Sequence, residues 1–469
     1  MSAILPKLER RTAEAKSPAA PPRIIDLPFP LWRIVVLLAL PVWGQKFLEL
    51  AVQLSDRLLA GRFVTEATQT SQAAQTTAGY VYWFLNSFTI LVSVGATALV
   101  ARFVGAGDRY SARHATSQSL LLGLVFGLAG GIVGLIFLPE FVGLLGLEGR
   151  SAEVTAAYLQ PLLAALPFQM MELVGVGCLV GAGDTVGGMW VLSGVAIINL
   201  PLAWTFFAFL GFEGIALGTA VSHSLGCLAI LILLFRGRAG LLVRFADFLP
   251  DRVMMWRILR ISVPAGVDSL SVMAGQLWFL RIVNQLGETA SAAHGIALQW
   301  EALGYQTGSA FGVAAMALVG QNLGAGRPRE AARSGWTAFA LGGGAMCIMG
   351  LIFYTLAGQM FGLFCPRPEQ ADIVELGVPV LRLIAFAMPL VASWSILAPA
   401  LRGAGDTRVP VWFGWFGFLC IRIPLAYYLT GPAGWGLIGA WWAMIADLLV
   451  RGTAFVIRFH SGSWQRIRV

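Results

Sequence analysis

Residues 181–185 of this 469-residue chain read Gly-Ala-Gly-Asp-Thr, and residues 403–407 read the same five letters again. Three other segments repeat in the same order. Trp32-Arg33-Ile34 recurs as Trp256-Arg257-Ile258, and residues 198–203 recur as 421–426. Between them, Ala98-Leu99-Val100 recurs as Ala317-Leu318-Val319, and each is followed by a Gly-Ala-Gly, at 105–107 and 324–326. The offsets between partners stay between 219 and 224 residues. Ordered matches at a nearly constant offset indicate that the chain consists of two equivalent halves.

The composition around these repeats is that of a membrane protein. Apolar residues make up 57% of the chain and charged residues 12%, whereas soluble domains carry about 45–50% and about 25%. So little charge cannot coat a soluble globule, which excludes a soluble enzyme and a disordered or fibrous chain. The apolar runs are long and do not alternate with period two, which argues against a transmembrane β-barrel.

The apolar runs predict twelve membrane-spanning helices. Their expected bounds are 33–60, 77–103, 113–138, 154–180, 185–210, 214–236, 255–284, 291–321, 331–357, 374–401, 408–430 and 436–459. Each half holds six spans, an even number, so both halves enter the membrane from the same side. The sequence therefore predicts an all-α polytopic membrane protein with two six-helix lobes related by a parallel internal repeat. Such repeats are typical of transporters, with the substrate site between the halves.

The predicted spans divide the chain into five parts. We expect a disordered cytoplasmic tail over 1–30, an N-lobe over 31–236, a cytoplasmic connector over 237–254, a C-lobe over 255–460 and a cytoplasmic tail over 461–469.

The distribution of basic residues predicts the orientation. The net charge is +8, and 24 of the 32 lysines and arginines fall on the side of the N-terminus, with only five on the other. Because basic residues collect in cytoplasmic loops, we expect both termini in the cytoplasm and the protein in a cell membrane, with a bacterial inner membrane favoured. The charge then reflects topology and not a nucleic-acid partner.

The two Gly-Ala-Gly-Asp-Thr segments predict turns at helix ends. Their glycines suit a helix C-cap, and we expect Asp184 and Asp406 to cap the helices that follow. The five cysteines and four histidines show no metal-ligand spacing, so no metal site is expected.

The first predicted helix carries a polar stripe, formed by Lys46, Glu49, Gln53 and Asp56. At ~100° per residue these positions share an arc of roughly 80°, so the stripe must face protein or water. Lys46 and Glu49 are close enough to neutralise each other. Asp56 lies further along the helix, where it is either a proton-exchanging carboxylate or a partner of the nearby Arg57 or Arg62.

Other charges within predicted spans are further candidates, because an ionisable group in the bilayer is costly and often functional. Asp268 and Glu301 are candidate C-lobe carboxylates for the cavity, with pairing to Arg382 or Arg422 as the structural alternative. Arg422 itself occupies the repeat position of Asn199, so the two lobes differ chemically there. We read Glu172 and Asp447 as structural.

Three motifs resemble the multidrug and toxic compound extrusion (MATE) family: residues 56–62 (DRLLAGR), 318–326 (LVGQNLGAG) and 402–407 (RGAGDT). The resemblance covers about 30–460. It implies a V-shaped pair of six-helix lobes that alternates between inward-open and outward-open forms. It also implies export of cationic or amphiphilic compounds against an inward flow of H⁺ or Na⁺, with Asp56 as the ion-coupling residue.

The resemblance also implies an ion-coupling role for Asn199. In the branch related to DinF proteins, an Asp four residues later completes the N-lobe ion site, but here that position is Ala203. The missing carboxylate favours H⁺ over Na⁺ without deciding between them. A lipid-linked oligosaccharide flippase of the same superfamily is the alternative function. It would need a strongly basic cavity, for which the candidates are Lys46, Arg382 and Arg422.

No catalytic motif for a membrane enzyme and no nucleotide-binding loop is present in the sequence. We therefore expect a transporter that is not an enzyme and has no cofactor besides its coupling ion. Small-molecule substrates and the lipid bilayer are its expected partners, and we expect a monomer.

Overall fold

A computed structural model describes residues 23–62, 68–144 and 149–467 of the chain, and for some helical residues, chiefly 53–83, only the backbone. Most of the predicted tail over 1–30 lies outside these ranges. The described part is all-helical and has twelve helices long and apolar enough to cross a membrane. The predicted fold class and the twelve spans are therefore confirmed.

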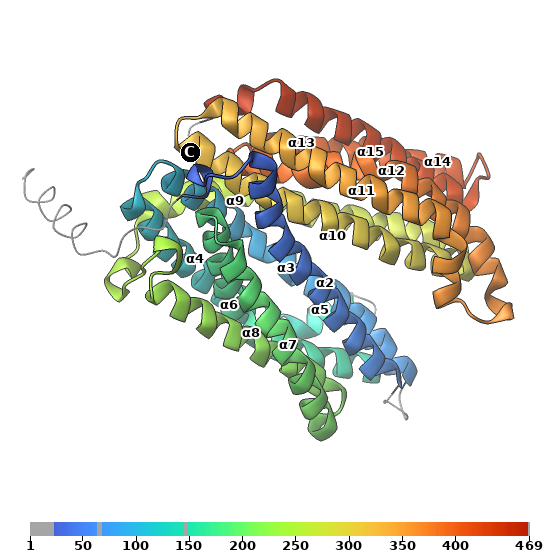
Figure 1. The fold of residues 1–469 in the computed structure, drawn as a ribbon. Helices are drawn as coiled ribbons and strands as arrows, with labels where there is room; N and C mark the ends of the chain where they lie inside the picture. Colours follow the sequence, from blue (N-terminus) through green and yellow to red (C-terminus); the bar gives the residue numbers. More distant parts are fainter. Residues whose placement is uncertain (1–22, 63–67, 145–148, 468–469) are drawn as a thin grey trace, which may run out of the picture.

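Seven α-helices form the first half (Figure 1): α2 (Leu31–Arg62), α3 (Thr68–Gly105), α4 (Arg109–Ile136), α5 (Leu138–Leu144), α6 (Gly149–Ala182), α7 (Thr185–Leu210) and α8 (Phe212–Phe235). The second half contains α9 (Arg252–Asn284), α10 (Glu288–Gly324), α11 (Pro328–Phe364), α12 (Ala371–Gly403), α13 (Arg408–Trp415), a π-helix (Phe416–Arg422), α14 (Ile423–Thr430) and α15 (Gly436–His460). Short α5 lies between two spans.

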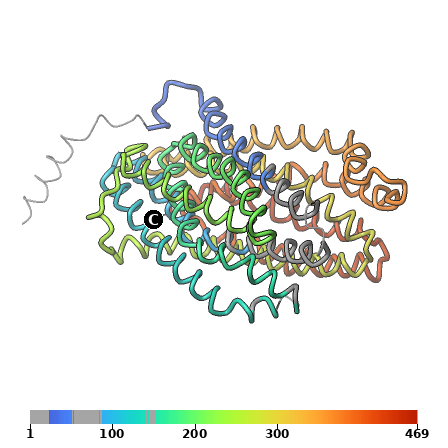
Figure 2. The backbone as a smooth tube through the Cα atoms, turned by 90° about the horizontal axis from the view of Figure 1, so that it is seen from below, coloured from blue at the N-terminus to red at the C-terminus, as the bar shows by residue number. Residues whose placement is uncertain are grey.

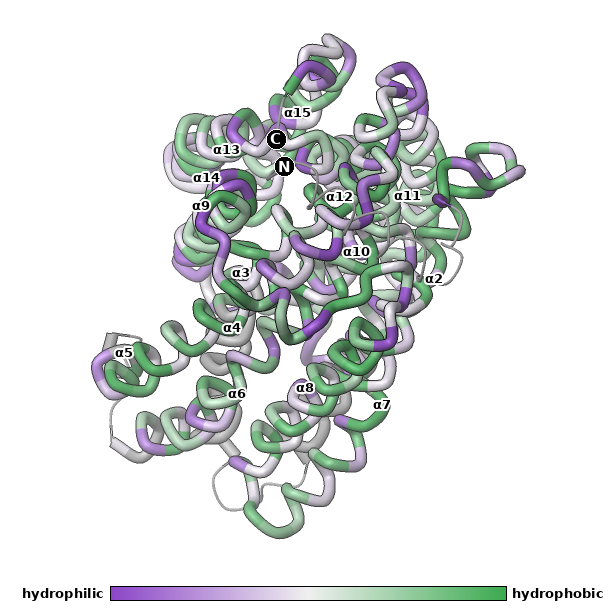
Figure 3. Tube along the Cα trace, turned by 90° about the vertical axis from the view of Figure 1, so that its left-hand side faces the viewer, coloured by the Kyte–Doolittle hydropathy of each residue, from purple (hydrophilic) through white to green (hydrophobic). Residues whose placement is uncertain are grey.

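The two bundles lie together at one end of the molecule and diverge toward the other. Figure 1 shows the C-terminus and the segment between α8 and α9 at the end where they meet, which we call the closed end. Viewed from that end in Figure 3, α5–α8 form one group and α11–α15 the other, with α3 and α10 between them. Helix α2 packs against both α7 and α10 and so touches both halves (Figure 2).

The halves meet through a reciprocal crossing of α3 and α10. A Cβ atom added to Gly105 of α3 would overlap the carbonyl oxygen of Gln321, and one added to Gly324 of α10 would overlap that of Arg102. These contacts exchange under the 219-residue offset of the sequence repeat. A contact that maps onto itself in this way is the mark of two units related by a two-fold rotation, as a parallel repeat requires.

The Gly-Ala-Gly segments form the predicted turns. Gly183 has φ 93° and Gly405 has φ 85°, values that favour glycine. The next residue in each case donates its backbone N–H to a carbonyl five residues earlier, Asp184 to Leu179 and Asp406 to Leu401, at 2.9 Å. Both segments are therefore glycine-terminated helix ends.

The capping prediction is right for one aspartate and wrong for the other. Asp184 accepts a hydrogen bond from the N–H of Gly187 at 2.8 Å and caps α7. No side chain caps α13, because the helix begins at Arg408 and its N-cap is Thr407; Asp406, one residue earlier, accepts from Arg458 Nε at 2.8 Å. Asp184 is likewise bound by Arg238. In each half, an arginine that follows or ends the sixth span thus holds the aspartate of the turn.

A short segment before α2, residues 23–26, contacts both halves at the closed end. Arg23 donates to the carbonyl of Gly105 at 2.8 Å and pairs with Asp26, while Asp26 pairs with Arg327 of the second half at 3.0 Å. Burial pushes the pKa of Asp26 upward, but hydrogen bonds from both arginines outweigh it and hold that pKa below its ordinary value. The segment therefore connects the ends of α3 and α10.

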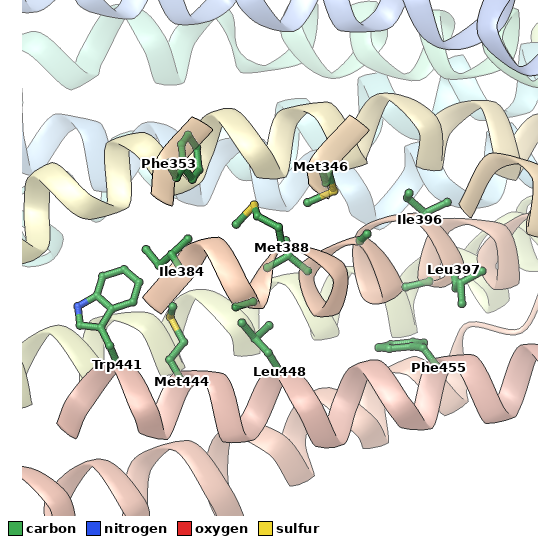
Figure 4. Close-up of a cluster of buried hydrophobic side chains, with 14 of the residues drawn as sticks. Met346, Phe353, Ile384, Met388, Ile396, Leu397, Trp441, Met444, Leu448 and Phe455 are labelled. Atoms are coloured by element: carbon green, nitrogen blue, oxygen red, sulfur yellow. The ribbon is translucent and has the colours of Figure 1, made fainter. Parts of the chain in front are cut away.

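Large side chains fill the core of the second half. Figure 4 shows residues of α11, α12 and α15 packed together, among them Met346, Phe353, Met388, Trp441 and Phe455. All five are nearly or fully buried. Such packing makes the bundle a stable unit on which site residues can be held.

The predicted span 408–430 is confirmed, but it is not one continuous α-helix. It is α13, a π-helical stretch and α14 in sequence. Pro424 has no N–H for the carbonyl of Cys420 four residues before it. The wider i→i+5 turn of a π-helix is a common way to accommodate such a break. Pro201, at the matching position, lies within unbroken α7.

Candidate functional site

The polar stripe of α2 begins with an ion pair between Lys46 and Glu49. Lys46 Nζ lies 2.8 Å from Glu49 Oε2, and Gln45 Nε2 donates to Glu49 Oε1 at 2.7 Å. The side chains of Lys46 and Glu49 are 27% and 31% exposed, so they are partly accessible. Gln53 and Asp56 follow on the same helix, but their side chains lie outside the described residues, and their roles stay predictions.

Helix α10 faces this part of α2 with aromatic and acidic groups. Trp43 Nε1 donates to Thr307 Oγ1 at 3.2 Å and ties the two helices together. On α10, Tyr305 stacks against Trp394 of α12, with ring centroids 5.2 Å apart. Tyr305 is also close enough to Lys46 to interact with it electrostatically. The junction of the halves therefore combines a Lys–Glu pair with an aromatic surface.

Glu301 lies one turn before Tyr305 on α10. It is partly exposed, and within the described part of the chain it has neither a hydrogen bond nor an ion pair. Arg422 interacts with it electrostatically without forming a salt bridge. Glu301 is thus the candidate carboxylate of the second half whose charge is least compensated.

Arg422 belongs to a buried ionic triad. Its Nε lies 2.8 Å from Asp447 Oδ2, and Arg451 Nε lies 2.6 Å from Asp447 Oδ1. Asp447 is fully buried, and Arg422 is 2% exposed. The carboxylate of α15 is therefore the structural anchor that we expected. Arg422 is bound within the second half and is not an open cationic site.

Asp268 is buried and paired with Arg402 Nη2 at 2.7 Å. The suggested partners Arg382 and Arg422 are thus wrong for this residue. The pairing depends on three-dimensional contact, because Arg402 lies at the end of α12, 134 positions from Asp268.

Asn199 lies buried on α7 and donates from Nδ2 to Thr219 Oγ1 of α8 at 3.1 Å. Its Oδ1 has no hydrogen-bond partner among the described residues. Ala203 is buried one turn further along and supplies no ligand. Within the described part, this corner offers only neutral oxygens.

Sequence reasoning missed a second polar pair in the first half. Glu172 of α6 and His223 of α8 are hydrogen-bonded, with 2.7 Å between Glu172 Oε2 and His223 Nδ1. The sequence predicts a structural role for Glu172 and none for His223. The available signal was that each is an isolated ionisable residue within a predicted span. The described residues contain no group of three potential metal ligands.

Comparison with known proteins adds family relationships. The family model MatE matches the chain twice, over 41–205 and 264–428, and the two matches are 223 residues apart. The chain is 27% identical to the probable multidrug resistance protein NorM of Thermotoga maritima over 444 residues, 92% of this chain and 93% of the relative.

Solved structures share the fold. A MOP superfamily transporter from Pyrococcus furiosus superposes with a TM-score of 0.88 at 21% identity, covering 96% of this chain and 100% of the other. A multidrug resistance MATE family transporter in an outward-facing conformation gives a TM-score of 0.86 at 21% identity, covering 95% and 100%.

Proposed function

Because the chain belongs to the MATE family, a family of membrane transporters, we propose that it is an antiporter that exports cationic or amphiphilic small molecules by alternating access. An inward flow of H⁺, with Na⁺ as the alternative, drives this export. The observation that carries the proposal is the junction of α2 and α10. There, the partly exposed Lys46–Glu49 ion pair and the Tyr305–Trp394 stack meet from the two halves.

The chemistry of this junction suits an organic cation. Aromatic faces attract cations, and carboxylates balance their charge. Asp56, further along the stripe, is the proposed coupling residue, and we assign a second coupling role to Asn199 of α7. A proton and a substrate cation then compete for one negative charge, so that the release of one favours binding of the other. A ligand shifts the two conformations only by its differential affinity for them.

The charge balance favours export of cations over the flippase alternative. A lipid-linked oligosaccharide carries a pyrophosphate and needs unpaired basic groups. Lys46 is paired with Glu49 and Arg422 with Asp447. Arg382 is exposed and lies over the ring of Tyr354, 5.8 Å from its centroid. None of the three candidates supplies uncompensated positive charge at the junction of α2 and α10.

Growth of an efflux-deficient bacterial host on organic-cation drugs tests this function. Expression of the chain should raise the tolerated concentration, and the Asp56→Asn variant should lose this effect while inserting normally. Asp108→Asn is the matched control, because Asp108 caps α4 at the closed end and should leave resistance intact. Undiminished resistance from the Asp56 variant would overturn the assignment.

We also propose that the closed end is cytoplasmic, in a bacterial inner membrane, and that the protein is a monomer. In a cysteine-free background, Leu249→Cys lies in the connector and Leu363→Cys near the far end of α11, both at strongly exposed positions. A membrane-impermeant maleimide applied to intact spheroplasts should label position 363 and not 249. The opposite pattern would reverse the orientation, and light scattering of the purified protein tests the oligomeric state.

A further inference from the structure

The Glu172–His223 pair lies deep within the first half. Glu172 is fully buried on α6, and the side chain of His223 on α8 is 12% exposed. Both residues fall well inside the membrane-spanning segments 152–182 and 212–235. Ionisable groups at such a depth are rare and usually functional. The described polar contacts of α2 with α10 do not involve this pair, so its presence needs an explanation of its own.

The packing of three helices makes room for this carboxylate. A Cβ atom added to Gly226 of α8 would lie 2.5 Å from Glu172 Oε1 and equally close to Val195 Cγ2 of α7. The missing side chain of Gly226 is thus the space that Glu172 occupies. Yet Oε1 has no hydrogen-bond partner in the part of the chain that the structure describes. One oxygen of the buried carboxylate is bound and the other is left without a donor, which is costly for a negative charge that no cation balances.

The pair continues a row of polar groups. Thr219 precedes His223 by one turn of α8 and accepts the hydrogen bond from Asn199. Glu49 of α2 is close enough to act electrostatically on both Glu172 and His223. Cys227 of α8 is the other described titratable group that faces Glu172. The pair therefore lies near Asn199, to which we assign a coupling role, and within electrostatic reach of Glu49 on the polar stripe of α2.

We propose that Glu172 and His223 form a second proton-binding site of the first half, coupled electrostatically to cation binding along α2. Loaded, the pair is an imidazolium and a carboxylate with no net charge. On unloading, the imidazolium N–H bond breaks, the proton passes to water, and the pair keeps one negative charge. A cation bound nearby balances that charge. This inference rests on the proposed antiport and adds residues to its coupling step.

Proton release on substrate binding tests the site directly. Ethidium is added to purified full-length protein in weakly buffered detergent solution, and a pH indicator reports the protons released while fluorescence anisotropy reports binding. With Asp56 and the pair both contributing, the Glu172→Gln variant should bind ethidium and release about half as many protons per ethidium as the wild type. Glutamine keeps a hydrogen-bonding group beside His223 but removes the negative charge that stabilises the imidazolium, so His223 should stay neutral and have no proton to release.

Two further variants make the result specific. His223→Asn removes the positive partner, so Glu172 should stay protonated and proton release should fall in the same way, which decides the question if Glu172→Gln fails to fold. His114→Asn is the matched control, because His114 pairs with Asp251 at 2.9 Å at the closed end and should release as many protons as the wild type.

The outcomes separate the two proposals. Wild-type proton release that persists unchanged in folded Glu172→Gln or His223→Asn protein would overturn the second site and leave the antiport proposal standing. A wild type that binds ethidium without releasing protons, or does not bind it, would instead contradict the proposed proton-coupled export.

Discussion

Asp447 illustrates how one carboxylate can hold two arginines inside the bilayer. It accepts hydrogen bonds from Arg422 of the π-helical segment and from Arg451 of its own helix. Removing one member of a buried ionic group leaves uncompensated charge, which costs about 3–5 kcal/mol. The Asp447→Asn variant should lose stability of this order in denaturant unfolding of the detergent-solubilised protein.

A surface carboxylate provides the control for this prediction. Glu330 pairs with Arg333 at 2.8 Å, with side chains 45% and 68% exposed, and such pairs contribute about 0–1 kcal/mol. Glu330→Gln should therefore change stability by at most ~1 kcal/mol. Equal losses from the two variants would show that the buried triad is not an anchor.

Asp251 gives the closed end an acid-sensitive contact. The hydrogen bond from His114 lowers the pKa of Asp251 below its ordinary value. Burial opposes this shift, and hydrogen bonds from the backbone N–H groups of Met254 and Val253 add to it. A lowered pKa in the folded state adds stability above the unfolded-state pKa, and this is lost as the pH falls through the folded-state pKa. The contribution should be present at neutral pH and disappear below about pH 4.

Thermal unfolding as a function of pH checks this sign. The stability difference between wild type and Asp251→Asn should be greatest near neutral pH and shrink below about pH 4. A difference that grows on acidification would mean that the pKa of Asp251 is raised instead.

The candidate residues could be predicted singly from sequence, but their partners could not. Isolated charges in apolar runs identified Lys46, Glu49, Asp268, Glu301 and Arg422. Only the pairing of Lys46 with Glu49 follows from helical spacing. Asp268 with Arg402 and Glu172 with His223 join residues of different helices, and periodicity within one helix carries no information on such contacts.

At the level of elements, the crossing of α3 and α10 depends on two glycines. Gly105→Ala and Gly324→Ala would each place a methyl group onto a backbone carbonyl of the opposite half. Overpacking of this kind typically costs about 1–3 kcal/mol, and here it falls on the contact between the halves. Each variant should lower the melting temperature of the purified protein.

Gly344→Ala of α11 is the matched control. No heavy atom lies within 4 Å of an added Cβ there, and alanine favours helices over glycine by up to about 1 kcal/mol. Its melting temperature should be unchanged or slightly higher. If all three variants behave alike, close approach of the glycines does not hold the halves together.

The elements themselves could be predicted well, because the repeat and the apolar runs are long signals. Their ends were less accurate: α3 begins at Thr68, earlier than the predicted 77, since its first residues are polar and carry no hydropathy signal. The capping of α13 by Asp406 failed because α13 begins one residue later after its turn than α7 does, which makes Thr407 the N-cap. The break before Pro424 could not be predicted from the proline alone, because Pro201 at the matching position causes no break in α7.

At the level of the whole molecule, the two bundles meet at the closed end and diverge at the other (Figure 1). The Arg23–Asp26–Arg327 contacts and the crossing of α3 and α10 hold that end together. With the closed end in the cytoplasm, as we propose, this arrangement is the outward-facing state. Alternating access then requires these contacts to break when the opposite end closes.

Transport by purified protein in proteoliposomes tests the central claim most directly. With ethidium as substrate, a pH gradient or a Na⁺ gradient is imposed separately at fixed membrane potential, and uptake into the vesicles is followed by fluorescence. The proposed antiport predicts uptake that follows the pH gradient, is indifferent to Na⁺ and is lost in Asp56→Asn. Uptake that follows the Na⁺ gradient and ignores the pH gradient would contradict proton coupling, and no gradient-driven uptake of any organic cation would contradict the antiport itself.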